Sequence, residues 1–274
     1  MSEKQVPIIV SGALGRMGKA IQEALEIFPE IDVAGFLESP EKLAGRTTLP
    51  LAGREIPSAS HLEKLSVPAG TIVIDFSHPS VTVELARQAA ALNVKLVIGT
   101  TGLSASDLAE LHEASRTTAV LVSGNMSVGI QALLAIIEEL AQSLKDFDIE
   151  IIEMHHRHKK DAPSGTALML AEAAAKARHQ DLRSVARHGR KGMLGERPAE
   201  EIGLHAVRGG DIVGEHIVVL AGEGEHLEFR HSAHSRRTFA MGALRAALYL
   251  SQQPRGFFTM RDVVKRTYSA ESNA

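Results

Sequence analysis

The chain contains no cysteine and no tryptophan among its 274 residues. Without cysteine it can form no disulfide, no thiolate metal site and no cysteine nucleophile. Aromatic residues make up only 4% of the sequence, so few side chains could stack on the bases of single-stranded nucleic acid. The lack of cysteine fits a reducing compartment, and we expect a cytoplasmic protein.

The sequence also lacks long apolar runs and an excess of positive charge. Residues 132–137 form one of its longest apolar runs, far below the ~20 residues that a membrane-spanning helix needs. Residues 1–7 do not resemble a secretion signal. The formal net charge is −3, which provides no overall positive field for nucleic acid or anionic lipid. We therefore expect no membrane or nucleic-acid partner, and any anion site must be local.

Short β-branched runs alternate with segments of helical period over the first half of the chain. Strands are expected at 6–10, 31–37, 71–76, 94–98 and 119–122, and helices at 16–28, 81–92 and 104–115, the last capped by Ser104. This alternation predicts an α/β fold with a Rossmann-like, doubly wound parallel sheet.

The pattern changes after residue 127. A helix at 128–144 leads to a strand at 148–155, a helix at 166–177 and a loop at 187–198. The runs 202–207, 215–221 and 226–233 are expected to be antiparallel strands, and 236–250 and 260–267 helices. We expect residues 128–235 to form an inserted α+β domain on a mixed or antiparallel sheet, with 1–127 and 236–274 forming the other domain.

Three glycines follow the first expected strand, at positions 12, 15 and 18. Glycine lets the backbone approach a pyrophosphate, and a helix N-terminus adds free N–H groups, although the usual spacing is G-x-G-x-x-G. Glu38 lies 38 − 18 = 20 residues beyond Gly18, where a carboxylate would accept hydrogen bonds from an adenosine ribose. A structural turn with an unrelated glutamate is the alternative, but the strand–turn–helix context favours a dinucleotide site.

The charge of Glu38 would repel a 2′-phosphate, which favours NADH over NADPH. Arg16 and Lys19 could offer that phosphate a cation, so use of both cofactors stays open. The segments 99–102 and 123–126 follow expected strands, where a doubly wound sheet holds its ligand.

Residues 155–166 read HHRHKKDAPSGT and concentrate histidines and permanent cations. A fold tolerates their mutual repulsion most readily where it binds negative charge or moves protons. A solvated basic loop is the alternative. A metal site built from His155, His156, His158 and Asp161 is disfavoured, because the neighbouring cations would repel a divalent ion, and no metal is expected.

In these segments taken together, the chain resembles the 4-hydroxy-tetrahydrodipicolinate reductases, also called dihydrodipicolinate reductases. The resemblance rests on GALGRMG at 12–18, DFS at 75–77, GTTG at 99–102, NMS at 125–127, EMHHRHKKDAPSGTAL at 153–168 and RGGDIVGEH at 208–216. It implies NADH- or NADPH-dependent reduction of a cyclic imine with two carboxylates, in the diaminopimelate route to lysine. It also implies a homotetramer, with residues 128–235 serving substrate binding and oligomerisation.

The resemblance also implies roles for individual residues. His155 resembles the family's proton donor and acceptor, Lys159 its proton donor, His156 a substrate contact, and Gly165 with Thr166 the pair that holds a substrate carboxylate. The dinucleotide contacts would be Gly12, Ala13, Leu14, Gly15, Arg16, Met17, Glu38, Gly99, Thr100, Thr101, Ser123, Gly124, Asn125 and Met126. Ser39 replaces a basic residue that some members carry, which weakens the case for NADPH.

Further cations and two rival functions stay open. Arg157 and Lys160 could add charge to the substrate site, and His231, Ser235 and Arg236 could approach a second carboxylate. A different nicotinamide-dependent reductase, such as a sugar or amino-acid dehydrogenase, would keep the glycine turn but explain the cations less well. A non-enzymatic NADH sensor would need no proton donor.

Overall fold

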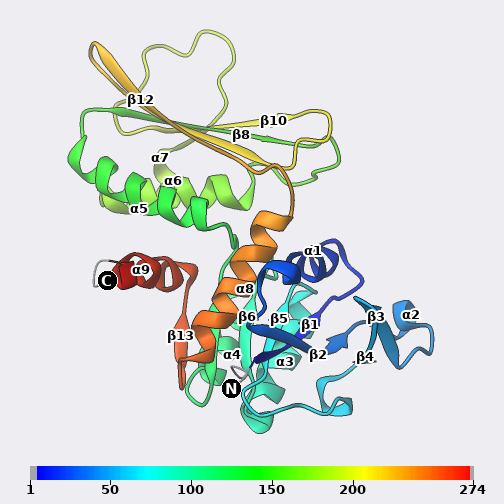
Figure 1. The fold of residues 1–274 in the computed structure, drawn as a ribbon. Helices are drawn as coiled ribbons and strands as arrows, with labels where there is room; N and C mark the ends of the chain where they lie inside the picture. Colours follow the sequence, from blue (N-terminus) through cyan, green and yellow to red (C-terminus); the bar gives the residue numbers. More distant parts are fainter. Residues whose placement is uncertain (1–4, 272–274) are drawn as a thin grey trace. The chain divides into compact units, whose positions relative to one another are not determined.

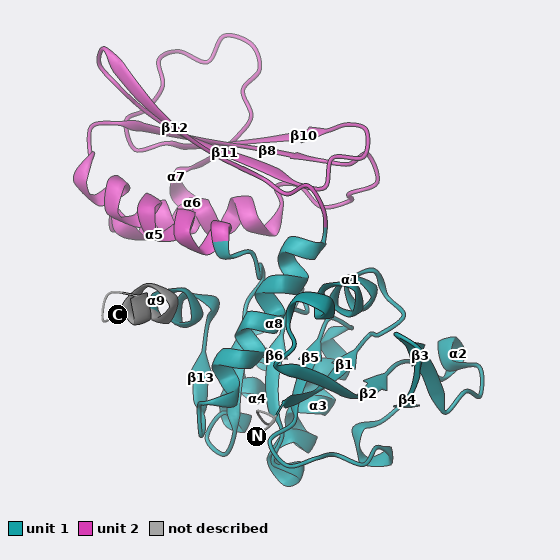
Figure 2. Cartoon of the chain, viewed as in Figure 1, with its two compact units in different colours: residues 1–128, 236–274 teal, residues 129–235 magenta. Residues whose placement is uncertain are grey.

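The structure, a computed structural model, describes residues 5–271 and the side chains as far as residue 265. The chain divides into two compact units, coloured separately in Figure 2. Unit 1 comprises residues 1–128 and 236–274, and unit 2 comprises residues 129–235.

Among the described residues, unit 1 contains one eight-stranded sheet in the order β13-β7-β6-β5-β1-β2-β4-β3 (Figure 1). Its strands are β1 (Val6–Ser11), β2 (Ile31–Leu37), β3 (Thr48–Leu51), β4 (Arg54–Ala59), β5 (Ile72–Asp75), β6 (Lys95–Ile98), β7 (Ala119–Val122) and β13 (Gly256–Phe258). Neighbouring strands are parallel except for β3 with β4. The strand order reverses between β1 and β5, as in a doubly wound sheet, so the predicted fold class is confirmed.

Helices cover both faces of this sheet. The helical segments of unit 1 are α1 (Arg16–Ala24), η1 (Leu25–Ile27), α2 (Pro40–Leu43), η2 (Leu62–Lys64), α3 (Pro79–Leu92), α4 (Ala105–Ala114), α8 (Arg237–Ser251) and α9 (Met260–Glu271). Ile72 and Ile74 pack in one core with α1 and α8, whereas Val73 packs in a second core with α3 and α4. Side chains alternate along a strand, and both sides of β5 are therefore buried.

The hairpin of β3 and β4 was not expected from the sequence. Its two-residue turn, Ala52 and Gly53, has positive φ at both positions, 48° and 79°. This is the geometry of a type I′ turn, in which asparagine or aspartate normally occupies the first position. Alanine there gives no such signal. The short elements α2 and β13 were missed as well, because three or four residues are too few to show a period.

Within residues 129–235, unit 2 forms a five-stranded sheet in the order β12-β11-β8-β10-β9. The strands are β8 (Asp148–His155), β9 (Ala186–His188), β10 (Ile202–Arg208), β11 (Glu215–Gly222) and β12 (Glu225–Ser232). The sheet is mixed: β11 is antiparallel to β8 and β12, and β10 is parallel to β8 and β9. Residues 202–207 run opposite to β11, as expected, but the expectation that they form an antiparallel pair is wrong: a helical crossover returns the chain to the side of β8 in the same direction, so β10 pairs with β8 in parallel.

The helices of unit 2 are α5 (Val128–Ser143), α6 (Gly165–Ala177) and α7 (Leu182–Val185). Helices α5 and α6 lie along one face of the sheet (Figure 1), where Ile137 and Leu170 share a core with Ile149 and Ile151. Alternation along β8 puts Glu153 and His155 on this same face. The strand therefore delivers a carboxylate and an imidazole beside the start of α6.

Candidate active site

The glycine turn between β1 and α1 is tightly packed. Gly12 has a φ of +76°, and a Cβ on it would lie 2.9 Å from the carbonyl oxygen of Phe76. A Cβ on Gly18 would lie 2.3 Å from the Gly12 carbonyl oxygen. Gly15 is the N-cap of α1 and offers no side-chain cap to the helix. The turn thus brings bare backbone and a helix N-terminus to one edge of the sheet, which suits a pyrophosphate.

Glu38 faces this turn from the end of β2. Its carboxylate is only 8% exposed and accepts hydrogen bonds from the backbone N–H groups of Leu14 and Ser39, both at 2.9 Å. The ammonium group of Lys42 donates to the same carboxylate at 3.1 Å. A carboxylate has about four acceptor positions, so these three donors leave one for a ligand hydroxyl.

A cavity of about 410 Å³ opens beside Glu38. Gly12, Gly15 and Glu38 line it, whereas residues 99–101 and 123–126 do not. Its remaining wall comes from segments that sequence reasoning did not assign, mainly 60–62, 76–78 and 81–88. The DFS run at 75–77 carried a usable signal, since it follows a strand at the carboxyl edge of the sheet.

Asp75 organises the neighbouring strand ends. Its fully buried carboxylate accepts hydrogen bonds from Ser77 Oγ at 2.5 Å, Thr82 Oγ1 at 2.5 Å and Thr100 Oγ1 at 2.9 Å. A Cβ on Gly99 would lie 2.1 Å from the Phe76 ring, so the ring requires a glycine there. Thr100 is thereby held at the end of β6, and Thr101 beside it is exposed.

The segment after β7 is held by local hydrogen bonds. Ser123 Oγ donates to the Asn125 carbonyl oxygen at 2.7 Å, and Asn125 Oδ1 accepts from the Ser127 N–H at 2.8 Å. Gly124 is exposed, whereas Met126 is 1% exposed and belongs to the core. Strands β1, β5, β6 and β7 are parallel neighbours, so the segments that follow them share one edge of the sheet.

Two arginines of unit 1 lie near one another. Arg16 is exposed at the start of α1, and Arg236 is the N-cap residue of α8. Burial lowers the pKa of Arg236 below its usual value, and the charge of Arg16 lowers it further. Like charges in proximity favour an anion between or beside them.

In unit 2, a buried ion-pair network surrounds His155. Glu153 is 0% exposed, and its Oε2 lies 2.6 Å from His155 Nδ1. Arg208, at the end of β10, donates to both carboxylate oxygens at 2.7 and 2.8 Å, and the backbone N–H of Ser164 donates to Oε1 at 3.0 Å. Burial acts to raise the pKa of Glu153, but these hydrogen bonds and charges hold it below its usual value. The carboxylate is therefore ionised at neutral pH.

His155 and His216 are both held in the neutral form. Burial is the largest cause of the lowered pKa of His155; Glu153 acts against it, and the charges of Lys159 and Arg208 add to it. Burial lowers the pKa of His216 to about 3, with repulsion from His155 second. The two rings meet edge to face with centroids 5.3 Å apart. A neutral imidazole can both accept and donate a proton, which suits acid–base chemistry.

The start of α6 adjoins this network. Ser164 is the N-cap of α6: its Oγ accepts the N–H of Ala167 at 3.2 Å and lies 3.0 Å from His216 Nε2. A Cβ on Gly165 would meet no atom within 4 Å, so the first turn of the helix is open there. The N-terminus of a helix with open space before it can receive a carboxylate.

The cations that follow β8 do not all share this site. Lys159 Nζ pairs with Asp161 at 2.9 Å, and this ion pair lowers the pKa of Asp161. The rings of His156 and His158 lie 6.2 Å apart, and His156 Nδ1 is buried with no hydrogen-bond partner in the part of the chain that the structure describes. Arg157 and Lys160 are exposed. Of the predicted catalytic and substrate residues, the structure places His155 in the network through Glu153, and Gly165 and Thr166 beside it, directly after Ser164. Lys159 lies close enough for its charge to act on His155.

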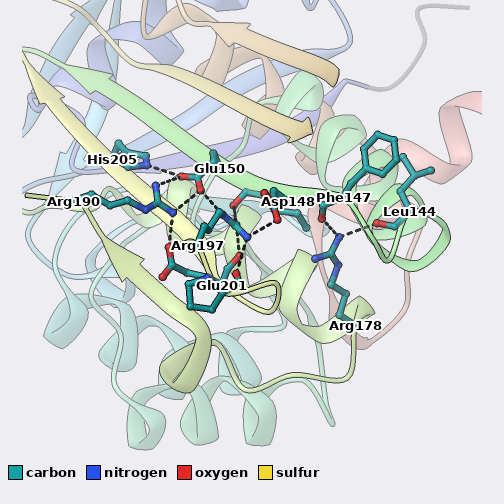
Figure 3. A network of polar contacts seen from close by, with 11 residues as sticks. Leu144, Phe147, Asp148, Glu150, Arg178, Arg190, Arg197, Glu201 and His205 are labelled. Carbon is teal, nitrogen blue, oxygen red and sulfur yellow. Dashed lines mark hydrogen bonds and ion pairs between the residues drawn. The ribbon is translucent and has the colours of Figure 1, made fainter. Parts of the chain in front are cut away.

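A second carboxylate of β8 lies on the opposite face of the sheet. Glu150 accepts hydrogen bonds from Arg190, Arg197 and His205 at 2.7–3.0 Å (Figure 3). Although burial acts to raise its pKa, these partners lower it to about 2. In the same view, Arg178 donates to the carbonyl oxygens of Leu144 and Phe147 and holds the turn that precedes β8.

Sequence reasoning gave no role to Glu153, Arg208 or Ser164. It interpreted His216 as a strand-surface or interface residue, whereas the structure buries it at 4% exposure. All four lie inside the quoted segments 153–168 and 208–216, so the segments carried a signal that the individual residues did not. Within the described part of the chain, no group of three histidine or acidic side chains is placed to hold a metal ion. Nor does any helix in that part have the length and apolar character needed to cross a membrane.

Comparison with known proteins follows the division of the chain. A family model described as "Dihydrodipicolinate reductase, N-terminus" matches residues 6–126, and one described as "Dihydrodipicolinate reductase, C-terminus" matches residues 129–264. A 4-hydroxy-tetrahydrodipicolinate reductase of Nitratidesulfovibrio vulgaris (strain DSM 19637 / Miyazaki F) is 45% identical over 261 residues, covering 94% of this chain and 98% of the relative. A protein of the same name from Nitrosospira multiformis is 44% identical, covering 94% and 97%.

Solved structures agree on the fold. A dipicolinate-bound dihydrodipicolinate reductase from Paenisporosarcina sp. TG-14 superposes with a TM-score of 0.76 at 24% identity, covering 94% of this chain and 99% of that one. A myo-inositol dehydrogenase from Corynebacterium glutamicum gives a TM-score of 0.55 at 13% identity, covering 97% and 95%. The fold is thus shared with a dehydrogenase named for a different substrate, and the sequence relatives identify the family.

Proposed function

The chain belongs to the dihydrodipicolinate reductase family, and from this premise we propose that it reduces 4-hydroxy-tetrahydrodipicolinate to tetrahydrodipicolinate at the expense of NADH or NADPH, in the diaminopimelate route to lysine. The observation in the structure that best supports the chemistry is the buried Glu153–His155 pair beside the open N-terminus of α6. A sugar dehydrogenase would need no site for a substrate carboxylate, and an NADH sensor would need no proton-exchange group.

The reaction balances with one hydride and one proton. The 4-hydroxyl group of the substrate leaves with a neighbouring hydrogen as water, which creates a carbon–carbon double bond conjugated with the imine. Addition of a hydride, which carries two electrons, and of one proton then saturates that bond. The protein must bind two carboxylates, keep water from the reacting carbons and deliver one proton.

The first turn of α6 would hold one carboxylate. The backbone N–H groups of Gly165 and Thr166 lie at the helix N-terminus, where partial positive charge accumulates. Ser164 caps the helix and so fixes the direction of these N–H groups, and Gly165 leaves room for the ligand. His156 would add a hydrogen bond to the substrate, because its buried Nδ1 has no partner among the described residues.

Lys159 would donate the proton, and His155 would exchange it. The ammonium of Lys159 rests on Asp161 at 2.9 Å, a partly exposed pair that is weak enough to give way to a substrate carboxylate. His155 binds Glu153 through Nδ1, so its Nε2 is the nitrogen available for proton exchange. Positioned acid–base groups of this kind contribute about 10²–10⁴-fold to a rate.

The residues of unit 1 fit a nicotinamide dinucleotide. A side chain at Gly12 would collide with Phe76, so the backbone of the turn stays accessible. In the cavity beside the turn, the Glu38 carboxylate has one acceptor position free. Residues 12–17 would hold the pyrophosphate, Glu38 the adenosine ribose, and residues 99–101 and 123–126 the nicotinamide half. When bound in reduced form, the cofactor supplies the hydride. The charge of Glu38 favours NADH, while the positive charges of Lys42 and Arg16 would allow the 2′-phosphate of NADPH to bind.

Oxidation of NADH, followed at 340 nm with freshly generated 4-hydroxy-tetrahydrodipicolinate, tests the proposal. We expect turnover that depends on this substrate, with either NADH or NADPH. Background oxidation without substrate is the control. Turnover with sugars or amino acids, but not with the dicarboxylate, would identify a different reductase. Cofactor binding without any turnover would identify a sensor.

The family resemblance also suggests a cytoplasmic homotetramer. Light scattering coupled to size-exclusion chromatography would measure the mass, with about four times 29.4 kDa expected. Cell fractionation would test the location.

A further inference from the structure

We infer that Glu153 is a positioning residue, which fixes the tautomer of His155 and, through Ser164, the N-terminus of α6. The inference rests on the proposed function, in which His155 exchanges a proton and α6 receives a carboxylate. Its first support is the full occupancy of the Glu153 carboxylate. His155 and Arg208 share Oε2, while Arg208 and the Ser164 N–H share Oε1. With four donors on about four acceptor positions, the carboxylate has one orientation.

The second support is the tautomer that this contact imposes. An ionised carboxylate only accepts hydrogen bonds, so His155 must carry a proton on Nδ1 to bind it at 2.6 Å. The lone pair of the neutral ring then lies on Nε2. A Cβ on Gly214 would lie 3.0 Å from this Nε2. The glycine therefore keeps space beside the nitrogen that would exchange protons with the substrate.

The third support is the charge around the ring. Glu153 on β8 faces His155 together with Arg208 on β10, Lys159 in the following loop and His216 on β11. The two cations disfavour an imidazolium, and the carboxylate favours it. Arg208 keeps Glu153 ionised by a bidentate ion pair. Glu153 is thus the one group of these four whose charge stabilises protonated His155.

Ser164 connects the same carboxylate to the substrate-binding helix. Its backbone N–H donates to Glu153, and its hydroxyl accepts the Ala167 N–H as the cap of α6. A rotation of the Glu153 carboxylate would therefore disturb both the imidazole and the first turn of the helix. One buried side chain thus fixes the position of the proton-exchange group relative to the carboxylate site.

The substitution Glu153→Gln tests this role in the full-length enzyme. Glutamine offers one acceptor oxygen and an NH₂ group that cannot accept from Arg208. We expect kcat to fall about 10- to 100-fold, the usual scale for a side chain that orients a functional group. Without the negative charge, protonated His155 is less stable, so the acidic limb of the kcat/KM profile should move to lower pH. The Kd of NADH, measured by fluorescence, should stay within about twofold of wild type.

Glu150→Gln is the matched control. Glu150 lies on the same strand and is bound by two arginines and a histidine (Figure 3). Alternation along the strand puts it on the face opposite to Glu153. Its removal measures what the loss of an equally bonded carboxylate does to the fold. We expect a comparable fall in Tm and an unchanged pH profile. If Glu153→Gln loses activity only in proportion to Tm, as Glu150→Gln does, the positioning role is refuted.

Nitrogen-15 NMR of the His155 ring gives a readout that needs no turnover. The wild-type enzyme should show the Nδ1–H tautomer, and Glu153→Gln a mixture of tautomers. A wild-type ring in the Nε2–H form would overturn the inference even if the variant does not fold. Failure of the wild type to reduce 4-hydroxy-tetrahydrodipicolinate would instead refute the proposed function, while the tautomer would still decide the role of Glu153.

Discussion

The buried His216 predicts a strong dependence of stability on pH. Its side chain is 4% exposed on β11, and burial lowers its pKa from 6.5 to about 3. Because the folded pKa lies below the unfolded one, the unfolded chain takes up the proton first as the pH falls. The stability that neutral His216 provides is complete above about pH 6.5 and is lost progressively between pH 6.5 and pH 3.

The size of this loss follows from the same two values. At pH 5 the imidazole is largely protonated in the unfolded chain and neutral in the folded one. This pH lies about 1.5 units below the unfolded pKa. At 1.36 kcal/mol per unit, the free energy of unfolding should fall by about 2 kcal/mol between pH 7 and pH 5 through this residue alone.

The substitution His216→Gln isolates the effect. The glutamine amide can donate a hydrogen bond to the Ser164 hydroxyl or accept one from it, but it does not titrate. Urea unfolding followed by circular dichroism at pH 7, 6 and 5 gives the free energy for both proteins; the chain has no tryptophan to follow. His155 and His231, whose pKa values burial also lowers, remain in both proteins. The difference between the two pH dependences therefore measures His216 together with its repulsion from these two rings. Parallel pH dependences for wild type and variant would refute the reasoning.

Three further substitutions test the proposed roles. Lys159→Ala should lower kcat by about 10²–10⁴-fold while Tm and the Kd of NADH stay near wild type, and full turnover would contradict its role as proton donor. Gly12→Val places a side chain against Phe76 at a positive φ, so the Kd of NADH should rise while the circular dichroism spectrum is kept; unchanged binding would refute the pyrophosphate site. Lys42→Ala leaves the charge of Glu38 without its cation, so the Kd ratio of NADPH to NADH should rise roughly two- to fivefold, the scale of an exposed ion pair. A constant ratio would exclude Lys42 from cofactor selection.

The sequence predicted the elements whose signals are local. The cap on Ser104 is confirmed, with Asp107 completing a capping box, because capping depends on residues three positions apart. The pairing of residues 202–207 was not predicted: β10 runs opposite to β11 but pairs in parallel with β8 and β9, and alternation along a strand does not encode which strands lie beside it. The turn at Ala52 was missed because alanine rarely adopts the φ that it has there.

The candidate site shows the same limit. The cluster at 155–166 stood out by composition, and the partner that fixes His155 did not. Glu153 reads as an ordinary charged residue in an alternating strand until the covered face of the sheet is known. Arg208 lies 55 residues further along the chain, and only the pairing of β10 with β8 places it beside Glu153. Register and burial are properties of the assembled sheet, so no local pattern could supply them.

The interrupted path of unit 1 has a consequence for synthesis. Residues 129–235 leave the ribosome before α8 and β13, which complete the core and the edge of the unit 1 sheet. Nascent chains normally fold domain by domain from the N-terminus. Here unit 1 is the first to begin synthesis and the last to complete its fold. Unit 2 is contiguous and can close its own core earlier. The apolar face of the unit 1 sheet stays uncovered until residues 237–251 have been made and form α8. A chaperone that binds exposed apolar strands has its longest opportunity during that interval.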